Sequence, residues 1–260
     1  MQNFLLKEKL SDQLIVLFTL ILAIIVWWLI FGWNLSNEPY IWDDLHFFRE
    51  YTKEELKNIW IGNWDSDGIE TPSYRPIAVL YYHCLYIIFE ENTFSLRNFV
   101  ILESLVLVLI SCSLLKKLNF NKNLILIFLI LIIFSKIYIT LISWFTISVL
   151  LFAYIFSISS ILFFLLSIEK KNKIYYFLSI TFASIAILTR EELYILPVVK
   201  FLFFFYKYEI NFKNFSNSLI KVSPFFLIVF LHMILRKIFI PDADHLQITG
   251  FLIKYGENFL

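Results

Sequence analysis

Residues 40–76, YIWDDLHFFREYTKEELKNIWIGNWDSDGIETPSYRP, form a long polar stretch in a chain that is otherwise strongly apolar. The chain has 260 residues, of which 60% are hydrophobic and 17% are charged, and its mean hydropathy is +0.76. A soluble domain of this size cannot bury so much apolar surface. Gly and Pro are scarce, at 5 and 6 residues, whereas a transmembrane barrel needs many turn residues. The composition therefore predicts an all-α polytopic membrane protein.

Charge, cysteine usage and motifs argue against several classes of protein. The net charge is +1 and the sequence contains no basic patch, so no nucleic-acid partner is expected. The two cysteines, Cys84 and Cys112, lie in apolar segments without the spacing of a disulfide framework or a metal site. The sequence contains no Walker loop, dinucleotide-binding fingerprint, HExxH motif or GxSxG motif.

The polar stretch belongs to a loop at 34–75 with nine acidic and four basic residues, a net charge of −5. A loop poor in Lys and Arg is typical of the outer face of a membrane. Within it, TKEE at 52–55 fits a capping box and predicts a short amphipathic surface helix. The apolar run at 77–89 is too short to cross a hydrocarbon core of about 30 Å. We expect it to be interfacial or re-entrant, with a short spanning helix as the alternative.

The lysines orient the predicted spanning helices, which lie at 13–33, 94–115, 124–140, 145–168, 174–189, 193–206 and 219–240. If the run at 77–89 does not cross, three short loops with nine lysines fall on the cytoplasmic side. The sequence therefore predicts about seven transmembrane helices, a cytoplasmic N-terminus and a long first outer loop at about 34–93 that contains short interfacial helices. Arg236 and Lys237 oppose this orientation unless they snorkel or have an anionic partner.

The domain organisation is expected to be simple. The sequence contains no internal repeat or linker, so residues 1–260 are predicted to form a single membrane-embedded domain. The N-terminal apolar run is about 20 residues long and lacks a small-residue cleavage site, which predicts a retained helix. The apolar tail ITGFLIKYGENFL, at 248–260, favours a chain that continues, so a C-terminal part is expected to be missing.

Two groups of carboxylates on the predicted outer side are candidates for chemistry. Asp43 and Asp44 suit a general base or a metal-binding site, and a solvated acidic loop is the alternative. Arg190, Glu191 and Glu192 follow the predicted helix at 174–189. They supply either a second carboxylate with its counter-ion or a simple interfacial turn.

Two arginines flank the predicted short helix at 77–89. Arg75 precedes it and Arg97 follows it. The planar fork of a guanidinium matches a phosphate group, so both are candidates for phosphate binding. Anchoring of the helix at the level of the lipid headgroups is the alternative.

The order of these features resembles the GT-C superfamily of membrane glycosyltransferases, which includes protein O-mannosyltransferases and lipid A aminoarabinose transferases. The resemblance covers nearly the whole chain. The matching residues are, in order, Trp42-Asp43-Asp44, Tyr74-Arg75-Pro76-Ile77, Phe94-Ser95-Leu96-Arg97-Asn98, Trp144, Thr189-Arg190-Glu191-Glu192 and Leu196-Pro197.

The resemblance implies an inverting transfer of a sugar from a polyprenyl phosphate to a glycan, lipid or protein acceptor. The site would face outward from a bacterial plasma membrane. Asp43 is expected to be the general base, with Asp44 beside it, while relatives differ in whether they bind a divalent metal. The phosphate-binding residues implied are Arg75, Arg97 and Arg190, and the supporting residues are Tyr74, Asn98, Glu191 and Glu192.

Two other functions stay open at this point. One is a polytopic transporter or flippase for a lipid-linked or anionic solute, and the other is a non-catalytic, truncated relative of the glycosyltransferases. A transporter typically shows inverted repeats and helices broken by Gly or Pro, which this sequence lacks. Members of the GT-C superfamily are usually longer, with further helices, whereas this chain ends after the seventh predicted helix.

Overall fold

The computed structural model describes residues 47–62, 73–90, 92–207 and 212–240, together with residues 21, 25 and 28. Asp43 and Asp44 lie outside the described residues, and so does the predicted helix at 13–33 apart from those three positions. The described part is helical and contains no strand, which confirms the all-α prediction.

The described elements are, in order, α4 Lys53–Asn58, α5 Pro76–Phe89, α6 Thr93–Lys117, α7 Lys122–Ile133, α8 Lys136–Ser143, α9 Phe145–Lys170, α10 Lys173–Thr189, the 3-10 helix η2 Glu191–Ile195, α11 Leu196–Lys207 and α12 Phe212–Phe239. Three of them, α6, α9 and α12, are long and apolar enough to cross a membrane. The consecutive helices α7 and α8 add a fourth candidate if they count as one span. This part of the chain is therefore typical of a membrane protein.

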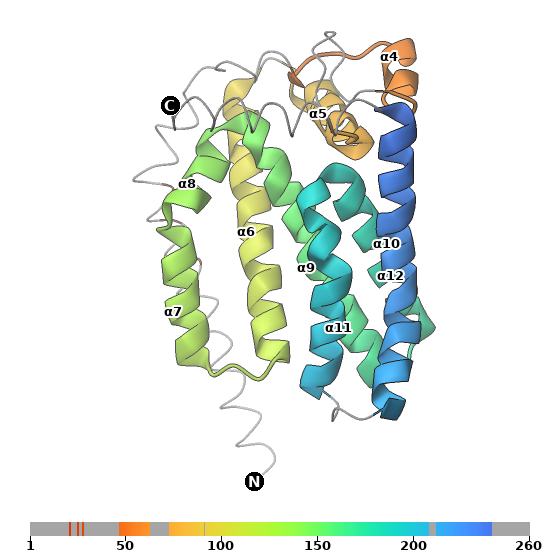
Figure 1. Ribbon diagram of the computed structural model, residues 1–260. Helices are drawn as coiled ribbons and strands as arrows, with labels where there is room; N and C mark the ends of the chain where they lie inside the picture. Colours follow the sequence, from red (N-terminus) through yellow and green to blue (C-terminus); the bar gives the residue numbers. More distant parts are fainter. Residues whose placement is uncertain are drawn as a thin grey trace, which may run out of the picture. The chain divides into compact units, whose positions relative to one another are not determined.

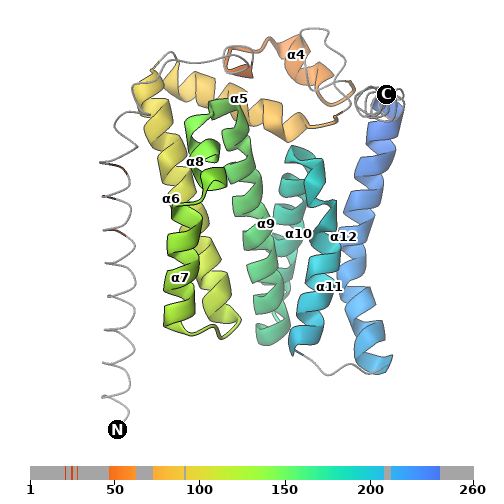
Figure 2. The same ribbon diagram turned by 60° about the vertical axis from the view of Figure 1, so that its left-hand side comes forward.

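The chain forms two compact units, each built from two separate stretches of sequence. Unit 1 comprises Met1–Leu45 and Phe89–Leu151, and unit 2 comprises His46–Ile88 and Phe152–Leu260. Within unit 1, α6 packs against α7 and α8. Within unit 2, α10, η2, α11 and α12 pack together (Figure 1), while α5 runs at a steep angle to them (Figure 2). The predicted 77–89 helix is thus confirmed as α5, and its interfacial location stays a prediction.

The spanning helix predicted at 124–140 is broken into two helices. Helix α7 ends at Ile133, α8 begins at Lys136, and the two axes differ by 53°. Ser135 lies at the break, where its hydroxyl accepts a hydrogen bond from the backbone N–H of Tyr138 at 3.1 Å. A serine that caps a new helix competes with continuation of the old one, which accounts for the bend.

The helix predicted at 193–206 is also interrupted. A 3-10 helix, η2, precedes α11, which begins at Leu196. Pro197 has no N–H to donate to the carbonyl of Leu193, which disfavours an uninterrupted α-helix through this point. Proline is favourable near the start of a helix, which is where it stands in α11.

Helix α12 contains a proline and remains continuous. Pro224 cannot donate a backbone hydrogen bond to the carbonyl of Ile220. The Ser223 hydroxyl donates to that carbonyl instead, at 2.9 Å. Such replacement by a neighbouring hydroxyl is how spanning helices tolerate proline where lipid offers no hydrogen bonds.

Many large apolar side chains are exposed and several polar side chains are buried, although the core itself is mainly apolar. Large apolar side chains are exposed on several helices, including Leu131, Ile137, Phe177, Ile220 and Phe230. Polar side chains are buried, including Arg97, Ser160, Ser179, Lys200 and His232. This distribution is expected where the surrounding solvent is lipid, because apolar groups then face outward and polar groups must find partners inside.

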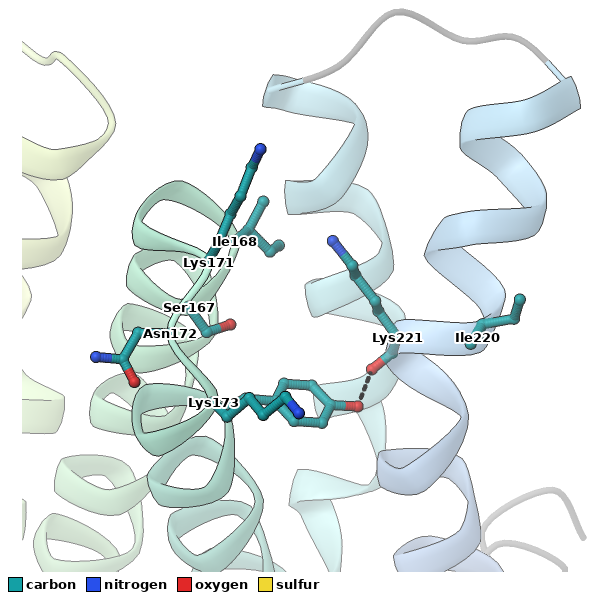
Figure 3. Close-up of a pocket in the computed structure, with 8 residues that line it drawn as sticks. Ser167, Ile168, Lys171, Asn172, Lys173, Ile220 and Lys221 are labelled. Atoms are coloured by element: carbon teal, nitrogen blue, oxygen red, sulfur yellow. Dashed lines mark hydrogen bonds between the residues drawn. The ribbon is translucent and has the colours of Figure 1, made fainter.

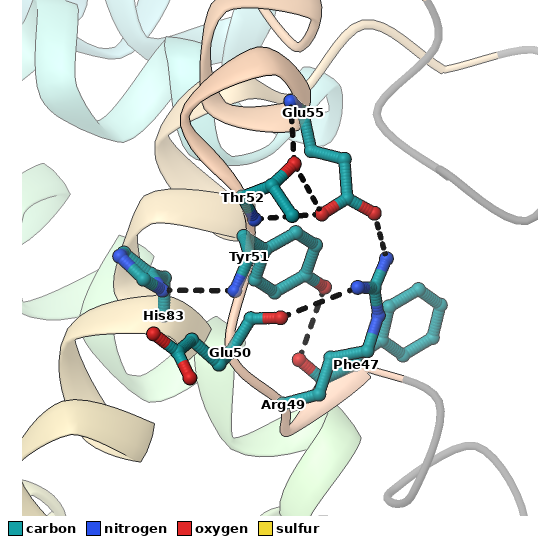
Figure 4. A network of polar contacts seen from close by, with 7 residues as sticks. All are labelled: Phe47, Arg49, Glu50, Tyr51, Thr52, Glu55 and His83. Carbon is teal, nitrogen blue, oxygen red and sulfur yellow. Dashed lines mark hydrogen bonds and ion pairs between the residues drawn. The ribbon is translucent and has the colours of Figure 1, made fainter.

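The predicted capping box at the start of α4 is confirmed. The Thr52 hydroxyl accepts from the N–H of Glu55 at 3.2 Å, and the Glu55 carboxylate accepts from the N–H of Thr52 at 2.7 Å (Figure 4). Arg49 donates to the same carboxylate at 2.7 Å. The segment is attached to α5 by a hydrogen bond from the N–H of Tyr51 to Nδ1 of His83 at 3.3 Å. A short helix that is too small to be stable alone is thus held by its cap and by α5.

Candidate functional site: an arginine cluster at one end of unit 2

Tyr74 is held by polar contacts from three other parts of unit 2. Its N–H donates to Oε1 of Glu191 at 2.9 Å, and its hydroxyl donates to the carbonyl of Trp60 at 2.8 Å. Its own carbonyl lies 3.1 Å from Nε2 of His232. Pro76 follows two residues later as the first residue of α5, a position that suits its fixed φ. The Tyr-Arg-Pro triplet therefore has a defined backbone, and the position of Arg75 follows from it.

Arg75 lies within an ion-pair cluster formed by residues far apart in the sequence. It is 4.0 Å from Glu191 and 4.0 Å from Glu192, which belong to η2. Arg190, directly before η2, is 3.8 Å from Glu192, and Arg236, near the end of α12, is 3.6 Å from Glu191. We call these five residues, Arg75, Arg190, Glu191, Glu192 and Arg236, the arginine cluster. Three guanidinium groups against two carboxylates give it a net charge of +1.

The cluster is mostly shielded from solvent. The side chains of its arginines and of Glu191 are 13–19% exposed, and that of Glu192 is 58% exposed. Burial of the Arg75 guanidinium, together with repulsion by Arg190, lowers its pKa, and the two carboxylates oppose this shift. The ion-pair separations are longer than the 2.7–2.9 Å of a charge-assisted hydrogen bond. The two glutamates therefore hold these arginines by ion pairs rather than by short charge-assisted hydrogen bonds.

Arg190 has a buried guanidinium N–H that is not engaged by either glutamate. Its Nε is buried and has no hydrogen-bond partner within the described part of the chain. The residue has extended backbone, with φ −148° and ψ 124°, at the junction between α10 and η2. A buried guanidinium N–H without an acceptor costs free energy, and a bound anion can remove that cost.

His232 and Tyr194 form a chain of hydrogen bonds that ends at Tyr74, the neighbour of Arg75. A carbonyl can only accept, so His232 carries its proton on Nε2 and donates to Tyr74. Nδ1 is then the acceptor for the Tyr194 hydroxyl. The Tyr194 hydroxyl therefore donates to Nδ1. The chain of bonds fixes Tyr74 against α12.

The structure brings together five of the predicted site residues within unit 2. Tyr74, Arg75, Arg190, Glu191 and Glu192 meet in unit 2, as described above. Arg97 and Asn98 belong to α6 of unit 1, where Arg97 donates to the carbonyl of Ser143 at 2.5 Å and Asn98 accepts from Nε1 of Trp28 at 3.1 Å. Asp43 and Asp44 lie outside the described residues, so their role as base stays a prediction.

The sequence analysis did not identify His232 and Tyr194 as residues of this region, and it left two alternatives for Arg236. Arg236 was expected either to snorkel or to have an anionic partner, and Glu191 is that partner. His232 and Tyr194 were not singled out. His232 stands four residues before Arg236 and therefore on the same face of α12, and this spacing is the signal that could have identified it.

A second polar site, also missed, lies inside unit 2 where α9, α10 and α11 meet. Lys200 is fully buried, and its Nζ donates to the hydroxyl oxygens of Ser160 at 2.5 Å and Ser179 at 2.9 Å. The two serines also donate to each other's carbonyl oxygens, at 2.5 and 2.7 Å. Lys200 lies over the ring of Phe225, with Nζ 3.3 Å from its centroid, a cation–π contact.

Metal binding and similarity to known proteins complete the description of the site. Within the described ranges, no three His, Cys, Asp or Glu side chains lie close enough together to hold a metal ion. Compared with protein-family models, curated proteins and solved structures, the chain matches none of them.

Proposed function

We propose that the arginine cluster binds the phosphate of a lipid-linked sugar and that the protein is a membrane glycosyltransferase of the GT-C type. The observation that carries the proposal is the convergence of Arg75, Arg190 and Arg236 on the carboxylates of Glu191 and Glu192, with the buried Nε of Arg190 unpartnered within the described part of the chain. Arginine suits phosphate because its planar fork donates two parallel hydrogen bonds. The resemblance selected Arg75 and Arg190 for this role, and they lie in one cluster although 115 positions separate them in the sequence.

The proposed reaction is an inverting displacement at the anomeric carbon. Asp43, with Asp44 beside it, removes the proton from an acceptor hydroxyl, and the acceptor oxygen forms a bond to the anomeric carbon. The bond from that carbon to the phosphate oxygen breaks, and the polyprenyl phosphate leaves with the electron pair. The arginines stabilise the charge that develops on the phosphate. The acceptor is a glycan, a lipid or a protein, and a divalent metal at the aspartates is compatible with the proposal.

The proposed arrangement in the membrane follows the charge pattern. About seven spanning helices, a cytoplasmic N-terminus and an outward-facing site in a bacterial plasma membrane agree with the nine lysines in three short loops. In that arrangement the acidic loop at 34–75, with the Asp43–Asp44 pair, lies on the side to which the arginine cluster belongs.

A binding and transfer assay tests the proposal. The protein is reconstituted in liposomes with a radiolabelled hexose on a short polyprenyl phosphate. Arg190→Gln is expected to weaken donor binding at least tenfold, because a charge-assisted hydrogen bond contributes about 1.5–3 kcal/mol. Lys237→Gln removes an exposed cation next to Arg236 and is the matched control, with little change expected. Wild-type donor binding by the Arg190→Gln protein would contradict the phosphate role.

The catalytic assignment has its own test. Asp43→Asn is expected to leave donor binding intact and to abolish sugar transfer, because an amide cannot take up the proton. Full transfer by this variant would show that Asp43 is not the base. Unchanged expression and an unchanged melting temperature are the control for folding.

Transport of a lipid-linked or anionic solute is the second candidate function. One observation favours it: Lys200 is an ionisable residue buried between helices, and such residues often mark a solute or proton path. Flux of the labelled lipid or of an anion across proteoliposomes, with no transfer or hydrolysis of the sugar, would support transport. Loss of that flux in Lys200→Met would assign it to this residue.

A further inference from the structure

A pocket of about 410 Å³ lies at the other end of α10 and α12 from the arginine cluster. Its polar lining consists of three lysines, Lys171, Lys173 and Lys221, with Ser167, Asn172 and Tyr176. We call it the lysine pocket. Figure 3 shows Lys171 and Lys221 extending to the same side, one from the connection between α9 and α10 and the other from α12. The volume is within the range of small-molecule sites.

The backbone around the pocket is well defined. Lys171 has φ 50°, a left-handed conformation that ends α9 and turns the chain. Asn172 then caps α10, and its side-chain oxygen accepts from the N–H of Ile174 at 2.8 Å. The Tyr176 hydroxyl donates to the carbonyl of Lys221 at 2.7 Å and joins α10 to α12 (Figure 3). The three lysines thus stand on fixed elements that enclose one space.

The described residues that line the pocket carry a formal charge of +3, because three of them are lysines and none is acidic. The neighbouring Lys170 is directed to the ring of Tyr175, with Nζ 5.2 Å from the centroid. An anion is the expected occupant, and the N-terminus of α10 adds the attraction of a helix dipole.

The helix surfaces that continue from the pocket are apolar. Ile174 and Phe177 on α10 and Ile220 on α12 are each 67–68% exposed. A free anion would make no use of these surfaces. A phospholipid would use both parts, because its headgroup would enter the basic pocket while its acyl chains lay along the exposed apolar side chains.

We propose that the lysine pocket binds the phosphate-bearing headgroup of an anionic phospholipid. The site is independent of the arginine cluster and of the reaction proposed for it. Each lysine near an anionic headgroup is expected to strengthen binding about fivefold, so the three together contribute roughly 100-fold.

The test uses the full chain, delipidated in a neutral detergent and titrated with phosphatidylglycerol, phosphatidylcholine or inorganic phosphate. Phosphatidylglycerol is expected to raise the melting temperature, and the other two are not. In Lys171→Gln/Lys173→Gln/Lys221→Gln the midpoint of the titration is expected to rise roughly 100-fold. Lys53→Gln/Lys57→Gln/Lys116→Gln removes three exposed charges elsewhere, and its midpoint is expected to stay within about twofold of the wild type.

Several outcomes would overturn the proposal. An equal response to phosphatidylcholine would show that charge is not recognised, and an equal response to inorganic phosphate would make the pocket a free-anion site. An equal loss in the two triple variants would show a non-specific effect of charge. The salt dependence of the wild-type protein gives a test that needs no variant: binding of phosphatidylglycerol is expected to weaken steeply with added salt, and an unchanged midpoint would contradict the site.

Discussion

The arginine cluster and the lysine pocket lie at opposite ends of the same two helices, α10 and α12. The 17 residues of α10 separate them by about 25 Å at 1.5 Å per residue. Both ends are rich in cations, but the arginine cluster contains Glu191 and Glu192, whereas the described residues that line the lysine pocket include no carboxylate. Positive charge is therefore balanced by carboxylates of the protein in the arginine cluster, whereas the described lining of the lysine pocket supplies no such counter-charge.

Burial explains the difference. Buried guanidinium groups need counter-charges within the fold, because water does not solvate them well enough. The lysines of the pocket are exposed and can remain solvated until an external anion replaces the water. An anion that enters the arginine cluster must fit around the carboxylates already present. An anion that enters the lysine pocket supplies the missing counter-charge itself.

The largest expected effect comes from removing the central counter-charge of the arginine cluster. Glu191→Gln leaves Arg75 and Arg236 without the carboxylate that both contact. We expect a loss of about 3 kcal/mol in the free energy of unfolding, because removing one charge of a buried ion pair leaves the other charge buried without compensation. Chemical denaturation in detergent micelles measures it.

Glu192→Gln is the matched control for that variant. Glu192 pairs with Arg75 and Arg190 but is 58% exposed. Its loss is expected to cost less than about 1 kcal/mol, as for other surface pairs. If the two substitutions lower the free energy of unfolding equally, burial does not determine how much each carboxylate stabilises the arginine cluster.

The Lys200 site provides a third case, a buried cation held by hydroxyl groups. Ser160→Ala or Ser179→Ala is expected to cost about 2 kcal/mol in the free energy of unfolding, because a buried donor loses an acceptor. Lys200→Met removes the cation at similar volume and is expected to be neutral or stabilising. If Lys200→Met destabilises more than either serine variant, the lysine itself holds α9, α10 and α11 together.

A smaller change makes the lysine pocket resemble the arginine cluster. Asn172→Asp keeps the cap of α10, since Asn and Asp are equally good in that position, and adds a carboxylate among the lysines. The melting temperature without lipid is expected to stay nearly constant, while the affinity for phosphatidylglycerol falls about fivefold. Unchanged affinity would argue against an electrostatic basis for the site.

The smallest expected effect concerns a half-buried ion pair, Arg49–Glu55, outside both ends. The hydrogen bond from Arg49, together with that from the N–H of Thr52, lowers the pKa of Glu55 to about 2 from its usual 4.5. The carboxylate therefore stabilises α4 above about pH 4.5, and this contribution is lost as the pH falls from 4.5 toward 2. Solvent screening keeps it below about 1 kcal/mol. Titration of the Glu55 carboxyl by NMR measures the pKa, and Arg49→Met is expected to raise it.

Several helices could be predicted from sequence because their apolar runs are long and bounded by clear signals. The runs at 94–115 and 145–168 correspond to α6 and α9, and TKEE at 52–55 corresponds to the cap of α4. The bend between α7 and α8 was not foreseen, because a lone serine in an apolar run does not by itself indicate a break. Ser135 becomes a cap only where the helix direction changes.

The candidate site could be predicted only in part. The Tyr74-Arg75-Pro76 triplet and the Arg190-Glu191-Glu192 turn were both identified, since charges next to apolar helices are conspicuous. Arg97 was grouped with them on sequence grounds, but its guanidinium donates to the carbonyl of Ser143 within unit 1. The direction of a single side chain depends on packing around it, which local sequence does not specify.

The sequence by itself determined that this protein is helical and suited to a membrane, because apolar composition and helix length are properties of the chain alone. It also determined which residues carry charge next to the apolar segments. Only the tertiary structure decided that Arg236 approaches Glu191, that His232 supports Tyr74, and that three lysines from α10, α12 and the preceding connection enclose one pocket. These contacts join residues up to 158 positions apart, and their formation depends on how the helices pack rather than on any local preference.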